Sequence, residues 1–75
     1  MSLENLREEI DEIDDQIIDL LERRLNIAKD LIKYKKNVTD ITRENEILAK
    51  IESEYIKNIY KTIFENSKKV QRKNL

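Results

Sequence analysis

The chain has 75 residues, enough for one small domain, and its 15 Lys and Arg nearly balance 16 Asp and Glu. It lacks Cys, His, Gly and Pro, which excludes disulfide scaffolds, closed zinc sites, histidine-based triads and glycine-rich phosphate loops. The net charge of -1 and the absence of a long apolar run argue against nucleic-acid or membrane partners, and charged residues at the start argue against a cleavable signal. We therefore expect one all-α domain over residues 1–75, in the cytoplasm and without a metal.

Residues 3–36 are predicted to form one long helix. Ser2 is a suitable N-cap, and Asn37 is the expected left-handed terminator after a last turn rich in Lys. Apolar residues recur at steps of three and four, apart from one gap of seven that contains Arg24. We call them the first-helix seam: Leu3, Leu6, Ile10, Ile13, Ile17, Leu20, Ile27, Leu31 and Tyr34. A seam that extends over about 50 Å needs a partner along its whole length.

Two further helices are predicted beyond a short connector at 38–39. Asp40 is a good N-cap for the second helix, which carries apolar residues at helical spacing up to Ile51. Ser53 is a weakly signalled break before the third helix, which continues to Val70. A single continuous helix therefore stays open as an alternative. The basic cluster near the C-terminus is interpreted as a solvated helix end: Lys68, Lys69, Arg72 and Lys73.

Polar side chains interrupt the apolar faces at five positions: Arg24, Lys35, Glu44, Ser67 and Gln71. Burying a charge without a partner is costly, so such groups must meet each other, water or a ligand. A polar layer that fixes the register of a bundle explains one such residue. Five residues on three segments, with cations in excess, favour a pocket for an anionic ligand.

Axial distances along the first helix constrain that pocket. Arg24 and Lys35 lie about 16 Å apart along a continuous helix, so their long side chains could hold a small dianion between them. Arg7 lies about 25 Å further from Arg24 and cannot reach the same pocket within its own chain. An antiparallel second copy of the first helix could supply it.

Motifs from Leu6 to Gln71 resemble those of the small all-helical chorismate mutases. They are residues 6–14 (LREEIDEID), 20–24 (LLERR), 33–35 (KYK), 40–44 (DITRE) and 63–67 (IFENS), with Gln71 one turn later. Each motif is weak alone, but their order on three helices is specific. The resemblance implies a shortened, standalone member with three helices per chain in an intertwined helical-bundle homodimer. The connectors between helices are shorter than in the family.

The resemblance also implies an activity, the cofactor-free [3,3] rearrangement of chorismate to prephenate. Arg24 and the partner's Arg7 would hold the two carboxylates of chorismate. Lys35 and Gln71 would donate hydrogen bonds to the ether oxygen, where negative charge develops as the C–O bond breaks. No proton transfer or covalent intermediate is needed, which is compatible with a chain that lacks His and Cys.

Four more residues receive supporting roles from the resemblance. Asp40 and Glu44 would orient the ring hydroxyl and the neighbouring backbone, while Arg43 and Ser67 would complete the wall of the pocket. Two other functions remain open: an isochorismate pyruvate-lyase on the same scaffold, and a non-catalytic helical oligomerisation module. The absence of Gly and Pro fits either an AT-rich coding bias or laboratory redesign.

Overall fold

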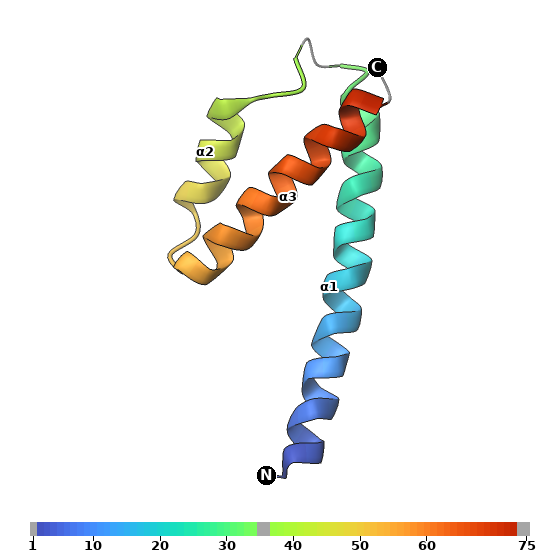
Figure 1. The fold of residues 1–75 in the computed structure, drawn as a ribbon, viewed down its shortest axis with the longest axis vertical. Coiled ribbons are helices and arrows are strands. Elements are labelled where there is room, and N and C mark those ends of the chain that lie inside the picture. The colour runs from blue at the N-terminus through green and yellow to red at the C-terminus, as the bar shows by residue number, and fades with distance from the viewer. Residues whose placement is uncertain (1, 35–36, 74–75) are drawn as a thin grey trace.

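A computed structural model gives the fold of residues 2–34 and 37–73, which are the residues that it describes. Its three helices are α1 (Leu3–Leu31), α2 (Ile41–Ala49) and α3 (Glu54–Lys73). Figure 1 shows α1 as a long rod, with α3 crossing one end of it and α2 beside α3. No strand occurs within the described ranges. The predicted all-α class and the order of a long, a short and a medium helix are confirmed.

Each helix begins at a residue whose side chain accepts a hydrogen bond from a backbone N–H three residues later. Ser2 does so at 3.1 Å, Asp40 at 3.0 Å and Ser53 at 3.4 Å. These oxygens satisfy amide groups that have no partner within the first turn of a helix. The cap at Ser53 follows a non-helical segment at residues 51–53. The alternative of one continuous second and third helix is therefore wrong.

The end of α1 differs from the prediction. The helix ends at Leu31, not at residue 36, and the amides of Lys33 and Tyr34 bond to carbonyls three residues earlier. Such tighter bonds commonly end a helix. Ile32 follows in a right-handed conformation and is buried, because the chain turns there toward the other helices. Because α1 ends at Leu31, with Ile32 as its right-handed C-cap, the helix is not terminated at Asn37 as expected.

Helix α3 holds the fold together because it packs against both α1 and α2. It contacts the C-terminal part of α1, while the N-terminal part of α1 projects away from the other helices (Figure 1). Among the described residues, the buried apolar side chains are Ala28, Ile32 and Phe64. A core this small is rarely enough to stabilise a chain of this length without an additional partner.

The N-terminal part of the first-helix seam is uncovered. Its six side chains are each between 41 % and 61 % exposed: Leu3, Leu6, Ile10, Ile13, Ile17 and Leu20. These apolar residues lie along one stripe of a regular helix, with no other helix over them (Figure 1). Within the described ranges, no helix is both long enough and apolar enough to span a membrane.

Candidate functional site

A cavity of about 250 Å³ lies where the three helices approach one another. Six of the eight residues expected at the site line it: Arg24, Asp40, Arg43, Glu44, Ser67 and Gln71. They come from α1, from α2 and its N-cap, and from α3. The fold thus gathers polar residues that are up to 47 positions apart in the sequence around one space.

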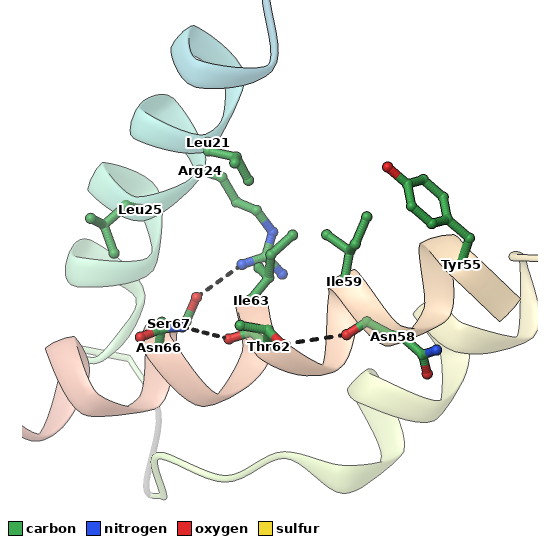
Figure 2. A pocket seen from close by; sticks show the side chains of 10 residues that line it. All are labelled: Leu21, Arg24, Leu25, Tyr55, Asn58, Ile59, Thr62, Ile63, Asn66 and Ser67. Atoms are coloured by element: carbon green, nitrogen blue, oxygen red, sulfur yellow. Dashed lines mark hydrogen bonds between the residues drawn. The ribbon is translucent and has the colours of Figure 1, made fainter. Parts of the chain in front are cut away.

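Arg24 reaches from α1 to α3. Its Nη1 donates a hydrogen bond to Ser67 Oγ at 3.1 Å, and its guanidinium carbon lies 5.8 Å from the centre of the Phe64 ring. Figure 2 shows this side chain pointing toward Ser67. Arg24 replaces an apolar residue of the seam at the place where α3 crosses α1, so the guanidinium is half-buried and held in a defined position.

Gln71 joins the last turns of α3 and α1. Its side chain is buried, and Nε2 donates to the backbone oxygen of Ala28 at 2.8 Å. Carbonyls in the last turn of a helix run short of helical partners, so this bond satisfies a group that would otherwise need water. The small side chain of Ala28 permits the close approach. The Gln71 amide is therefore fixed in orientation at the wall of the cavity.

Glu44 and Lys68 form an ion pair between α2 and α3. Lys68 Nζ lies 3.1 Å from Glu44 Oε2, with the two side chains only 14 % and 23 % exposed. The hydrogen bond to Glu44 raises the pKa of Lys68 above its ordinary value; nearby Glu65 adds to this effect and burial opposes it. Lys68 therefore stays protonated at neutral pH, and its charge faces the Glu44 carboxylate.

Lys68 also corrects the interpretation of the C-terminal basic cluster. It lines the cavity and is not a solvated helix end, whereas Lys69 and Arg72 are exposed. The signal lies in its spacing, because Lys68 is four residues after Phe64 and three before Gln71. These positions share one face of a helix. An interpretation of the cluster by charge alone overlooks that Lys68 lies on the apolar stripe of α3.

Asp40 and Arg43 lie at the rim of the cavity. Asp40 Oδ1 accepts the hydrogen bond from the Arg43 amide that starts α2. The guanidinium of Arg43 forms an exposed ion pair with Glu46, at 3.3 Å between Nη1 and Oε2. Exposed pairs of this kind contribute little to stability, so Arg43 can exchange its partner at low cost.

One expected site residue, Arg7, is not brought to the cavity by this chain. Arg7 is exposed on the projecting part of α1, about 25 Å along the helix from Arg24. Lys35 lies outside the described residues. Because α1 ends at Leu31, the distance expected between Arg24 and Lys35 along one helix does not apply.

A second, larger hollow of about 620 Å³ lies beside the first, between α1 and α3 (Figure 2). Its lining is mainly apolar: Leu21, Leu25, Tyr55, Ile59 and Ile63. Among its described lining residues, Arg24 carries the one charge, and Arg24 and Ser67 face both hollows. The apolar hollow suits a hydrophobic helix face, whereas the smaller polar cavity suits a charged ligand.

The charges around the smaller cavity favour an anion. Arg24, Arg43 and Lys68 supply three cations against Asp40 and Glu44. Within the described part of the chain, no cluster of side chains could hold a metal ion. The cavity can therefore bind an anionic molecule, donate hydrogen bonds to it and fix its conformation, all without a catalytic nucleophile.

Comparisons with known proteins identify the family that the chain resembles. The family model of chorismate mutase type II matches residues 6–72. The chain is 36 % identical over 87 aligned residues to the bifunctional chorismate mutase/prephenate dehydratase of Buchnera aphidicola subsp. Acyrthosiphon pisum (strain APS). That alignment covers 99 % of this chain but only 23 % of the relative. No solved structure gives a significant match.

Proposed function

This chain belongs to the chorismate mutase type II family, and we propose that it converts chorismate to prephenate in a cytoplasmic homodimer. The family match covers nearly the whole chain, which supports a single catalytic domain. The observation that carries the proposal is the placement of Arg24, Glu44, Ser67 and Gln71 around one cavity. These residues come from all three helices and face the same space, as a shared ligand requires.

The proposed reaction needs only binding and electrostatic stabilisation. One C–O bond breaks and one C–C bond forms within the same molecule, so no proton or electron enters or leaves. The flexible substrate must be held in a compact, chair-like conformer, which removes much of the entropic part of the barrier. Negative charge grows on the ether oxygen as the C–O bond breaks, and donors placed there lower the barrier.

The family resemblance supports a specific role for each side chain. Arg24 would bind a carboxylate, since its guanidinium can donate two parallel hydrogen bonds while Ser67 and Phe64 hold it in place. Gln71 and Lys35 would donate to the ether oxygen. Asp40 and Glu44 would accept from the ring hydroxyl, with Arg43 and Ser67 closing the wall.

A second copy of the chain would complete the site. The uncovered part of the first-helix seam and the apolar hollow beside it favour a partner helix of the same kind. Fully burying a Leu or Ile is worth about 1.5–3 kcal/mol, and roughly half of each side chain is still exposed, so closing the seam adds on the order of 1 kcal/mol per side chain. An antiparallel α1 would also bring the partner's Arg7 toward Arg24.

Incubation with chorismate tests the proposal. We expect the ultraviolet absorbance of chorismate to fall and prephenate to be the product. Arg24→Ala should lower kcat/KM at least about 100-fold, because the loss of one charge-assisted contact in a dry site costs roughly 3 kcal/mol or more. Helical content by circular dichroism should change little, since the alanine stays on a regular helix.

The matched control is Arg23→Ala, which removes the same charge from the next residue. Arg23 is exposed and pairs only with Asp19 one turn away, at 3.7 Å, so activity should stay within about twofold of the parent. Equal activity of the two variants would contradict the proposed cavity. Release of pyruvate from isochorismate, without turnover of chorismate, would instead identify a lyase. Inertness toward both substrates would favour the oligomerisation module.

A further inference from the structure

The ion pair between Lys68 and Glu44 differs from the other ion pairs among the described residues. Each of the others links side chains three or four positions apart in the sequence, either within one helix or, for Asp30 and Lys33, across the end of α1. Lys68 and Glu44 instead connect α3 to α2 and lie in the cavity lining, where both are largely shielded from water. A pair in such surroundings is screened less than a surface pair and has a larger effect on the groups beside it.

We propose that Lys68 is a positioning residue that keeps the Glu44 carboxylate ionised and aimed into the cavity when an anionic substrate binds. The inference rests on the proposed function, in which Glu44 accepts a hydrogen bond from the substrate hydroxyl. A carboxylate accepts at all its lone pairs, whereas its protonated form is a poorer acceptor. An entering dianion favours protonation of Glu44 by like-charge repulsion. Lys68, 3.1 Å away, opposes that effect.

Among the described residues, the other cations that line the cavity have different partners from Glu44. Arg43 on α2 is engaged by Glu46, and Arg24 on α1 is held by Ser67. Two carboxylates lie in the same surroundings: Asp40 before α2, which lines the cavity, and Glu65 on α3, which also contacts Lys68. The hydrogen bond to Glu44 raises the pKa of Lys68, so this lysine remains charged across the neutral range. Among the described residues, Lys68 is thus the counter-ion of Glu44.

The experiment compares pH profiles of kcat/KM for the parent and for Lys68→Gln. Without the lysine charge, Glu44 should take up a proton at higher pH, so we expect the acid limb to move up by about one pH unit. At pH values below the limb, kcat/KM of Lys68→Gln should then be about tenfold lower than that of the parent at the same pH. Well above the limb, the two values should agree within about threefold. Lys68→Arg should restore the parental limb, because the cation is retained.

Three controls separate positioning from general effects. Lys69→Gln removes the same charge from the neighbouring exposed position and should leave the limb in place. Lys68→Met keeps the aliphatic stem that packs between the helices and should reproduce Lys68→Gln, even if the glutamine variant folds poorly. In a Glu44→Gln background, loss of Lys68 should have almost no further effect on the profile, because nothing remains to be positioned.

A titration of the Glu44 side-chain carboxyl by carbon NMR in the substrate-free protein makes the test independent of activity. Its midpoint should lie at higher pH in Lys68→Gln than in the parent, and unchanged in Lys69→Gln. An unmoved midpoint or an unmoved acid limb overturns the inference. So does an additive effect of the two substitutions. If the parent itself fails to convert chorismate, the proposed function fails, while the NMR titration still decides the role of Lys68.

Discussion

The two parts of α1 carry the same apolar spacing but have different surroundings. Residues 21–31 lie against α3, and Arg24 and Ala28 there contact Ser67 and Gln71. Residues 3–20 continue the seam with no helix of this chain over them, and their seam side chains are about half exposed, as are Ile27 and Leu31. One continuous helix therefore serves two purposes. Its C-terminal part builds the cavity of its own chain, and its N-terminal part is suited to another chain.

The largest expected effect comes from a charge in the uncovered part of the seam. Ile13→Lys places an unpaired cation where an apolar contact with a second chain is proposed, at a cost of several kcal/mol. We expect the dimer to dissociate, and helicity and activity to be largely lost. Sedimentation velocity and circular dichroism measure these changes. Asp15→Lys, a larger charge change on the opposite face of α1, should leave the dimer intact. A dimeric, active Ile13→Lys would contradict the proposal that the N-terminal part of α1 packs against a second chain.

An intermediate effect is expected at the covered end of α1. Gln71→Ala removes a donor assigned to the transition state, so kcat should fall by about 10²–10³ with a smaller change in KM. Gln71→Glu sharpens the test. The new carboxyl would face the Ala28 carbonyl oxygen, which lies 2.8 Å from the amide nitrogen of Gln71 in the parent. Because the carboxyl is buried and a carbonyl oxygen cannot donate a hydrogen bond to it, its pKa is raised.

That glutamate is useful only while it is protonated, because only then can it donate. Activity and stability of Gln71→Glu should therefore be highest at acid pH and decline as pH rises through the raised pKa. The parent should show no such decline over the same range. Steady-state kinetics and thermal melts between pH 5 and 8 measure both. A profile that parallels the parent would mean that Gln71 does not act as a donor.

The smallest effect is a recovery, and it tests directly whether the two parts of α1 serve different sites. Arg7→Ala and Arg24→Ala should each be inactive alone. In a hybrid dimer, one cavity carries both substitutions and the other carries neither. Random mixing makes about half the dimers hybrid, so up to roughly a quarter of the cavities should be intact. Co-refolding, with hybrids verified by native mass spectrometry, should restore activity to that extent. If verified hybrids show no recovery, Arg7 acts within its own chain or at no site.

Much of the fold could be predicted from the sequence, because the information was local. Helical spacing and a capping residue located Asp40 as the start of α2, whereas Ser53 was only a weak break before α3. Arg24, Ser67 and Gln71 could be selected because each places a polar group on an otherwise apolar stripe. Their direct partners could not be predicted, since the bond from Gln71 to Ala28 depends on where α3 crosses α1.

The end of α1 illustrates information that is not local. Residues 32–36 are compatible with a continued helix, and the apolar spacing extends to Tyr34. The helix nevertheless ends at Leu31, and Ile32 is buried. Tertiary packing of the returning chain outweighed a weak local preference. Lys68 was missed for a similar reason, because its partner Glu44 is 24 positions away and becomes a neighbour only when α2 lies beside α3.

The turn between α2 and α3 determines which residue types the chain can carry at this corner. The chain reverses at residues 50–53 with Lys50 in the right-handed region and no positive φ among the described residues, so the reversal does not require glycine. The backbone amides of Lys50 and Ile51 bond to Ile47 and Leu48, which excludes proline at those two positions. Glu52 faces solvent without such a constraint. A chain without glycine can therefore form this corner.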